Sequence, residues 1–234
     1  MPKRILFKNI IILLLISCTG IISPLAHAAP CYGPTMPEKN QFFIGGQTYS
    51  VLKRYLIHDY GKMRSLQHFL LISYGLTDWF SVDLKGGAGY IKQHPGSQDE
   101  IDYPTYVGGG YGFRIKAFDK NKTKVIFGFQ HISIHPYSIE VNNVKHKAVL
   151  DDWQWSLLAS YEFPLCTPYL GTRWSRMDYI HWTDDVRKLK KSDVTKSVGA
   201  IIGVDIPLGE KFWINLEGQF VDAEAVAASI NFRF

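Results

Sequence analysis

Apolar and polar residues alternate with a period of two through most of the chain beyond residue 41. In residues 226–234 one face carries valine, alanine, isoleucine and two phenylalanines, whereas the other carries alanine, serine, asparagine and arginine. Such alternation is typical of β-strands whose two faces meet different surroundings. The same division recurs within 79–91, 151–163, 195–206 and 212–221. A soluble β-sandwich would also alternate, so this pattern predicts strands without choosing between a sandwich and a barrel.

The lengths of the connections favour a closed barrel. Short connections fall near 76–79, 119–122, 164–166 and 207–211. Longer polar connections fall between them, near 53–64, 92–103, 135–150 and 180–193. Strict alternation is expected when one end of a membrane barrel faces the periplasm and the other faces the outside. The last connection, near 221–224, is the exception because it is short on the long-loop side.

We therefore expect an all-β fold, a transmembrane antiparallel up-and-down β-barrel of about ten strands. Each expected strand is close to the roughly 9–11 residues that cross a bilayer at a tilt. Eight strands are the alternative, if the first pair or the last hairpin is misread. The ten expected strands lie near 41–52, 65–75, 79–91, 104–117, 124–134, 151–163, 167–178, 195–206, 212–221 and 225–234.

The first 28 residues have the features of a secretory signal peptide. Basic residues at the start precede an apolar run over 10–16, and Ala-His-Ala at 26–28 forms a small-x-small cleavage site. We expect cleavage after Ala28. Lipidation at Cys18 is the competing route, because the residues before it also fit a lipoprotein cleavage pattern. Either route exports the protein.

Export divides the chain into a signal peptide over 1–28, a periplasmic N-terminal segment over 29–40 and a barrel domain over 41–234. Residues 1–28 hold three basic and no acidic residues, so their removal lowers the formal net charge from +5 to +2. The basic character belongs largely to the signal peptide. Because no basic stripe remains, we expect no binding to nucleic acid.

Two short motifs resemble those of bacterial outer-membrane β-barrel proteins. Residues 226–234, Val-Ala-Ala-Ser-Ile-Asn-Phe-Arg-Phe, resemble the closing strand, which typically ends in a phenylalanine read by the barrel-assembly machinery. Residues 74–79, Tyr-Gly-Leu-Thr-Asp-Trp, look like a periplasmic turn of small barrels. The resemblance implies an outer-membrane location, Phe234 as the assembly signal, and contact with outer-membrane lipid and lipopolysaccharide. It implies no particular activity and no oligomeric state.

Nine charged residues fall on the faces that we expect to point into the barrel. The lumen of a barrel of about ten strands is narrow, so four acids and five bases there would pair with one another. We expect a lumen plugged by salt bridges, with a narrow polar channel as the alternative. The nine residues are Asp83, Lys85, Arg114, Lys116, Glu162, Arg173, Asp205, Glu217 and Arg233.

The histidines beyond the signal peptide fall in or near the expected outer loops. Loops are commonly polar, and these histidines show no spacing that is diagnostic of a metal site. We expect no metal and no cofactor.

The sharpest enzymatic hint is the pair His131 and Ser133, with Glu140 seven residues further on. Residues two apart on a strand point to the same side, which lets a general base lie near a nucleophile. The pair is similar to the His-x-Ser pair of lipid A deacylases, although Ile134 replaces the asparagine that usually follows. An omptin-type protease is disfavoured, because neighbours such as Asp151 and Asp152 point to opposite faces of a strand.

Cys31 and Cys166 are the cysteines left after cleavage at Ala28. The topology predicts that both lie on the periplasmic side, where the oxidising environment lets a disulfide persist. We expect a Cys31–Cys166 bridge that draws the N-terminal segment beneath the barrel mouth. Two separate thiols, or a bond from Cys31 to another protein, are the alternatives.

The sequence thus predicts an integral outer-membrane barrel with a structural or surface-interaction role. A lipid-modifying enzyme of the outer leaflet is the alternative, and narrow-pore transport is the third possibility.

Overall fold

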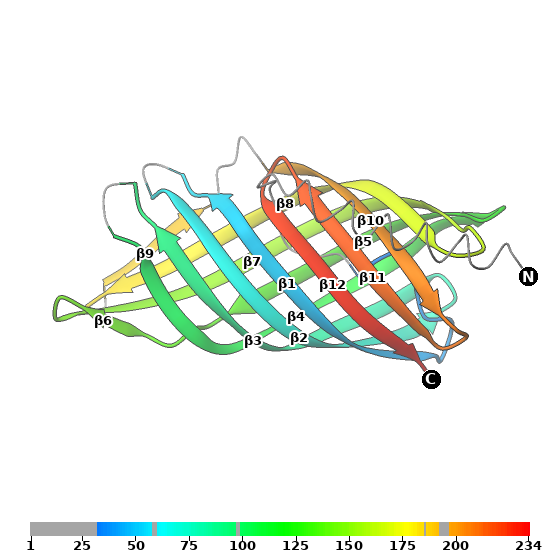
Figure 1. Cartoon of the computed structure of the whole chain (residues 1–234), viewed down its shortest axis with the longest axis horizontal. Helices are drawn as coiled ribbons and strands as arrows, with labels where there is room; N and C mark the ends of the chain where they lie inside the picture. Colours follow the sequence, from blue (N-terminus) through cyan, green and yellow to red (C-terminus); the bar gives the residue numbers. More distant parts are fainter. Residues whose placement is uncertain (1–31, 58–59, 97–98, 185, 192–196) are drawn as a thin grey trace, which may run out of the picture.

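The computed structural model describes residues 32–57, 60–96, 99–184, 186–191 and 197–234 (Figure 1). None of these residues belongs to a helix long and apolar enough to cross a membrane. Two short strands, β6 (Ile139–Val141) and β9 (Val186–Lys191), lie outside the barrel wall. The wall consists of β1 (Phe42–Tyr55), β2 (Lys62–Thr77), β3 (Phe80–His94), β4 (Ile101–Lys120), β5 (Thr123–Ile134), β7 (Val144–Tyr161), β8 (Thr167–Thr183), β10 (Val198–Leu208), β11 (Phe212–Phe220) and β12 (Glu224–Arg233).

Pairing between strands joins the wall into a closed ring. Each wall strand is antiparallel to its neighbours, in the order β1-β2-β3-β4-β5-β7-β8-β10-β11-β12. The ring closes where β1 pairs with β12, with Ile44 opposite Phe232 and Thr48 opposite Ala228. The expected ten-stranded barrel is therefore confirmed, and the eight-stranded alternative is wrong.

Part of the sheet continues beyond the barrel wall. β7 stops pairing with β5 at Leu150, and β8 stops pairing with β10 at Trp174. Beyond these residues β7 and β8 still pair with each other and with the short strands β6 and β9. We call this sheet the outer extension, made of β6, residues 144–150 of β7, residues 178–183 of β8, and β9.

The outer extension corrects two expectations of the sequence analysis. Long polar connections were expected over 135–150 and 180–193, yet much of both segments is strand. Leu150 and Tyr179 at the base of this sheet are buried, but polar residues such as His146 and Lys147 occupy both faces of its outer part. The period-two signal depends on one apolar face and one polar face, and it is therefore weak here.

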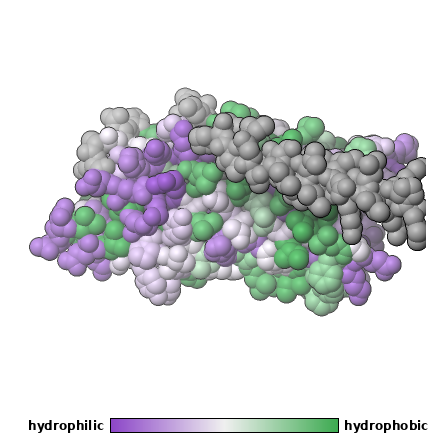
Figure 2. All heavy atoms as spheres, in the orientation of Figure 1, coloured by the Kyte–Doolittle hydropathy of each residue, from purple (hydrophilic) through white to green (hydrophobic). Residues whose placement is uncertain are grey.

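Successive side chains along each wall strand point alternately outward and inward. The outward-pointing ones form an apolar outer surface. Figure 2 shows apolar side chains gathered over the half of the barrel that holds the C-terminus, and hydrophilic ones at the opposite tip. This inside-out arrangement suits a wall surrounded by lipid. Outward-facing exposed residues include Leu84, Leu170, Ile202, Leu216 and Ile230.

Exposed aromatic side chains form a belt near each end of the wall. Trp79, Phe163, Phe212 and Phe234 lie near the short turns. Tyr106, Trp153, Trp155 and Trp174 lie toward the outer extension. Tryptophan and tyrosine favour the boundary between hydrocarbon and water, so the two belts delimit the part of the wall that lipid would cover.

An arginine in place of Leu216 tests this reading of the wall. Leu216 is 41% exposed at the middle of β11, where a charge would face hydrocarbon. We expect Leu216→Arg to lower the free energy of unfolding by about 2–4 kcal/mol. Denaturant unfolding in lipid bilayers measures the loss.

Leu189→Arg is the matched control, because Leu189 is 44% exposed but lies on β9 of the outer extension. It should change the free energy of unfolding little. Equal losses in the two variants would contradict the lipid-facing assignment of the wall.

Candidate functional site: the barrel interior and the outer end

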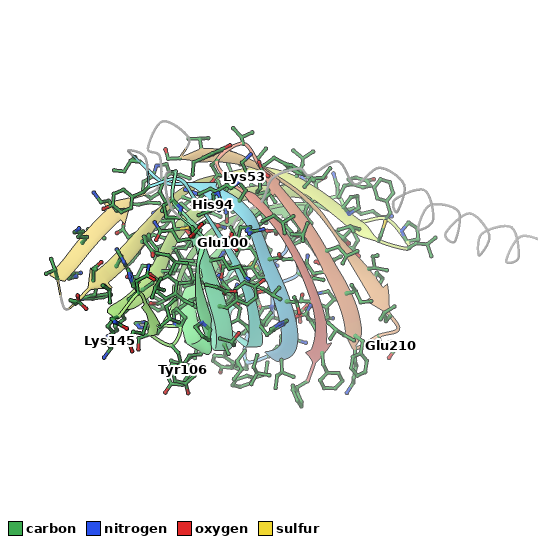
Figure 3. The ribbon with its side chains drawn as sticks, turned by 60° about the vertical axis from the view of Figure 1, so that its left-hand side comes forward. Lys53, His94, Glu100, Tyr106, Lys145 and Glu210 are labelled. Atoms are coloured by element: carbon green, nitrogen blue, oxygen red, sulfur yellow. The ribbon has the colours of Figure 1, made fainter. Side chains whose placement is uncertain are left out.

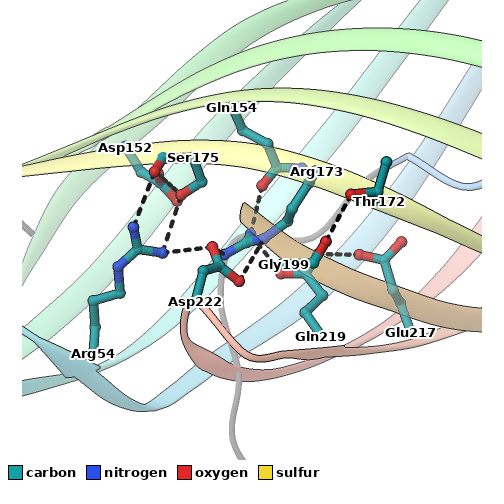
Figure 4. A network of polar contacts seen from close by, with 10 residues as sticks. All are labelled: Arg54, Asp152, Gln154, Thr172, Arg173, Ser175, Gly199, Glu217, Gln219 and Asp222. Atoms are coloured by element: carbon teal, nitrogen blue, oxygen red, sulfur yellow. Dashed lines mark hydrogen bonds and ion pairs between the residues drawn. The ribbon is translucent and has the colours of Figure 1, made fainter. Parts of the chain in front are cut away.

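Two buried arginines share one carboxylate toward the outer end of the interior (Figure 4). Asp222, in the turn between β11 and β12, accepts hydrogen bonds from Arg54 of β1 and Arg173 of β8. The Arg54 Nη1–Asp222 Oδ2 distance is 2.8 Å, and all three side chains are at most 1% exposed. A single acid therefore connects three separate parts of the wall across the lumen.

The remaining donors of these two arginines are also satisfied. Arg173 Nη1 donates to the side-chain oxygens of Gln154 at 2.7 Å and Gln219 at 2.8 Å. Arg54 donates to the hydroxyl and to the backbone carbonyl of Ser175, both at 3.1 Å. Removing a charge from water is costly unless its hydrogen bonds are replaced, and here they are replaced.

A second ion pair lies nearer the short turns. Arg114 of β4 binds Asp83 of β3 with two parallel bonds, Nε to Oδ2 at 3.0 Å and Nη2 to Oδ1 at 2.7 Å. Such bidentate geometry is the strongest form of an arginine–carboxylate pair. Beside it, the Lys85 ammonium donates to the side-chain oxygens of Gln47 and Gln130 at 3.1 and 2.9 Å.

The N-terminal segment enters the barrel and binds these charges. The third nitrogen of Arg114 donates to three backbone carbonyls of the segment, at Thr35 (2.6 Å), Gly33 (3.3 Å) and Tyr32 (3.4 Å). The Tyr32 ring lies against the Lys85 ammonium, 4.2 Å from the ring centre. Of the periplasmic segment predicted over 29–40, residues 32–37 lie within the barrel.

The other side of the segment binds an acidic group. Asp205 of β10 accepts hydrogen bonds from the backbone and the hydroxyl of Thr35. Gly33 has a φ of 74°, and a Cβ there would lie 2.8 Å from the Asn215 amide nitrogen. Glycine is required at this point, because the backbone is left-handed and touches the wall.

The rest of the interior combines one further polar chain with an apolar cluster. Asn215 donates to Asp205 and to the Tyr169 hydroxyl, which in turn donates to Glu217 at 2.8 Å. Side chains from most wall strands form the apolar cluster, which includes Tyr49, Val51, Met63, Ile91, Tyr103, Ile132, Leu150, Met177 and Tyr179. Cavities beside Tyr32 have volumes of about 10 Å³, which is at most room for one water molecule.

Six of the nine charges predicted to face the lumen are buried in the interior: Asp83, Lys85, Arg114, Arg173, Asp205 and Glu217. The other three lie elsewhere. Glu162 follows the end of β7, and its side chain is 55% exposed beside Lys124. Lys116 pairs with Asp119 near a short turn, and Arg233 is half-buried over the Phe43 ring at the end of β12. All three stand at strand ends, where the inward direction leads out of the barrel.

Sequence reasoning missed three charged members of the interior, namely Arg54, Asp152 and Asp222. Arg54 and Asp222 fall in segments assigned to connections, and Asp152 was considered only beside Asp151. Asp152 is 4% exposed and points inward, whereas Asp151 points outward. The alternation along β1 could have predicted that Arg54 points inward only if it continued unbroken past Val51. A register shift at that point breaks it.

The His131–Ser133 pair lies on the outward face of β5, at the level of the outer aromatic belt. Ser133 stands opposite Asp151 of β7, and the Ser133 hydroxyl is 2.8 Å from Nε2 of His135. His131 stacks on Trp153 with ring centres 4.1 Å apart, and its Nε2 is 3.7 Å from Asp151. Serine, histidine and aspartate side chains therefore lie close together. The histidine that contacts Ser133 is His135, whereas the histidine beside Asp151 is His131.

Glu140, the third member expected for this cluster, does not join it. Glu140 stands on β6 opposite Lys145 of β7, whereas His131 stands opposite Trp153 of the same strand. Lys145 is eight residues from Trp153 and six from Asp151, the partner of Ser133. These separations span about 26 Å and about 20 Å along the strand, so Glu140 lies well away from both members of the pair.

The outer extension holds a pair of stacked histidines beyond the aromatic belt. Nδ1 of His146 lies 3.3 Å from Nε2 of His181, and the two rings are 5.6 Å apart. Burial, followed by the neighbouring His146 and Lys188, lowers the pKa of His181 to about 4. His181 is therefore uncharged at neutral pH.

Within the described residues, no group of three or more histidine, cysteine, aspartate and glutamate side chains could hold a metal ion. Cys166 lies half-buried in the turn between β7 and β8. Cys31, Cys18 and the signal peptide over 1–28 lie outside the described residues. The disulfide and both processing routes stay predictions.

A closed antiparallel ladder, an apolar outer surface and a polar interior define the fold of an outer-membrane β-barrel. No protein-family model matches the chain. Among solved structures, the chain is similar to the translocator domain of the autotransporter NalP from Neisseria meningitidis, with a TM-score of 0.47 and 12% identity over 84% of this chain and 90% of that chain.

The chain is also similar to Ail, the attachment invasion locus protein of Yersinia pestis, with a TM-score of 0.43 and 9% identity over 85% of this chain and 100% of that chain. For the outer-membrane protease OmpT from Escherichia coli, the TM-score is 0.39 and the identity 11%, over 88% and 96% of the two chains.

Asparagine in place of Asp222 tests the central network. The change leaves two buried guanidinium groups without a compensating charge, so we expect the free energy of unfolding to fall by about 3–5 kcal/mol. Asp102→Asn removes the partner of Lys92 from an exposed pair and should cost less than about 1 kcal/mol. Denaturant unfolding of both variants measures the difference, and equal losses would refute a stabilising role for the interior network.

Proposed function

We propose that this protein is an integral outer-membrane barrel whose interior conducts no ions and whose role is structural or surface-interacting. In this proposal residues 1–28 direct export to the periplasm, and Phe234 is read by the barrel-assembly machinery. The wall is then surrounded by outer-membrane lipid and, on its outer side, by lipopolysaccharide.

The observation that carries the proposal is the threaded N-terminal segment. Residues 32–37 occupy the lumen and are bound on one side by Arg114 and on the other by Asp205. Four cations and five acids are buried in the same interior, namely Arg54, Lys85, Arg114, Arg173, Asp83, Asp152, Asp205, Glu217 and Asp222. These charges are held by one another or by the polar side chains and backbone around them. They leave no hydrated path for an ion, which disfavours a pore.

Electrical recording across planar lipid bilayers tests the proposal. We expect the mature protein to show no steady conductance, because the segment and the interior charges block the lumen. Deleting residues 32–37 removes the donors and acceptors that bind Arg114 and Asp205, and it should produce measurable channel openings.

Lys39→Ala is a control at the rim, since the Lys39 side chain is exposed and its hydrogen bond to Asp78 near a short turn is made by the backbone nitrogen. It should stay closed like the parent. Steady conductance of the parent protein would overturn the proposal and favour narrow-pore transport.

The second candidate function is a lipid-modifying hydrolase at the outer leaflet, and one contact favours it. The 2.8 Å distance between Ser133 and His135 is suited to proton transfer from a nucleophile to a base, and the site lies at the depth of the outer aromatic belt. Fatty acids released from lipopolysaccharide by the parent, Ser133→Ala and His135→Ala proteins test it. Absence of release from the parent, or equal release from all three, would remove this candidate.

A further inference from the structure

We propose that the outer extension is a binding surface for an acidic polysaccharide outside the cell. The inference rests on the proposed surface-interaction role and names the partner class of that surface. The site consists of exposed cations on β7 and β9 around the side chain of Trp182. Its ligand would carry sulfate, phosphate or carboxylate groups along a sugar chain.

The first argument is that, in the described part of the extension, cations outnumber acids and make no ion pair with them. Among the described residues, five cations of the extension make no ion pair within 4.0 Å: Lys145, Lys147, Arg187, Lys188 and Lys190. Three described acids lie near these cations. Asp178 is bound by Arg176, Asp184 accepts from the backbone of Lys145, and Glu140 stands opposite Lys145.

The rim over β1 to β3 has the opposite arrangement. There Lys53 pairs with Glu224 at 3.1 Å, and Arg64 and Lys92 pair with Glu100 and Asp102. Figure 3 shows Lys53, His94 and Glu100 gathered at this rim, whereas Lys145 lies at the far tip of the extension. Of these two parts of the outer end, the extension therefore carries more unpaired positive charge than the rim over β1 to β3.

Aromatic rings support three of the five cations. The Trp182 ring has the Lys147 ammonium 5.1 Å from its centre and the Arg187 guanidinium 5.9 Å from its centre. These residues form one row, since Trp182 pairs with Lys147 on β7 and with Arg187 on β9. The Lys190 ammonium lies 4.1 Å from the ring centre of Tyr60. Such contacts hold the charges in fixed positions without neutralising them.

The charges would repel one another in the free protein. Trp182 and His181 are neutral neighbours, so nothing on these two rows offsets the cations of β7 and β9. A polymer with many negative groups would relieve this repulsion and release its own counterions on binding. Its sugar rings could stack on the indole, which a simple anion could not do.

Distance from the aromatic belt selects a polysaccharide over the membrane surface. Trp182 follows the belt residue Trp174 by eight residues on β8, which is about 26 Å along the strand. At a strand tilt of about 35–45°, this distance places Trp182 about 18–21 Å above the belt. Lipid phosphates at the level of the belt therefore lie beyond the reach of Lys147 and Arg187, which pair with Trp182. The cations instead stand where a polymer in the external medium would meet them.

Binding of the full mature protein in neutral phosphatidylcholine nanodiscs to immobilised heparin tests the proposal. Heparin supplies sulfate and carboxylate groups on a sugar chain, and uncharged dextran is the blank. We expect heparin binding that weakens at least tenfold between about 50 and 200 mM salt, as polyanion contacts do. Lys145→Gln, Lys147→Gln and Lys188→Gln combined in one variant should weaken it at least tenfold.

The matched control is a variant that combines Lys120→Gln, Lys122→Gln and Lys211→Gln. These three lysines are exposed at the short turns, and the variant loses the same net charge. It should bind heparin like the parent. Equal weakening in both triple variants, or no heparin binding by the parent, would overturn the proposal. Binding confined to nanodiscs that contain lipopolysaccharide would also overturn it, in favour of a membrane glycolipid.

Bilayer conductance of the same preparations separates this inference from the proposed function. A closed parent barrel that fails to bind heparin refutes the polysaccharide site alone, whereas a conducting parent refutes the closed interior.

Discussion

Closure of the hydrogen-bonded ring between β1 and β12 is the constraint on which the rest of this structure depends. A membrane interior supplies no water to satisfy backbone groups, so every strand of the wall must have a neighbour on both sides. Ten strands meet that demand and enclose a narrow lumen. The side chains that point into it must satisfy each other, which explains why Asp222 serves both Arg54 and Arg173.

The buried charges of the interior bind partners from distant parts of the chain. Arg54 and Asp222 are 168 residues apart in sequence, and Thr35 and Asp205 are 170 apart. The N-terminal segment takes part because its backbone carbonyls complete the hydrogen bonding of Arg114. In the proposed function, a lumen filled in this way makes the barrel a rigid support, and recognition belongs to the part that stands above the membrane.

The two ends of the barrel differ in a way that matches this division of roles. Short turns close the end that holds the C-terminus, whereas β7 and β8 carry a sheet well beyond the outer aromatic belt. Exposed loops and extensions carry function on many rigid scaffolds. The unneutralised cations around Trp182 lie on that extension, and the Ser133 cluster lies at its base.

The sequence by itself determined the fold class, the ten strands and the inward direction of residues such as Asp83 and Arg173, because the period of two is a local property of each strand. It could not supply the outer extension, because polar residues on both faces of its outer part erase that period. Nor could it supply the threaded segment or the role of Asp222, since neither has a local pattern. Only the tertiary structure decided these, because the partners of a buried charge are set by which strands face each other across the lumen. For the same reason Glu140 was assigned to Ser133 on spacing alone, while pairing across β5 and β7 brought Asp151 there instead.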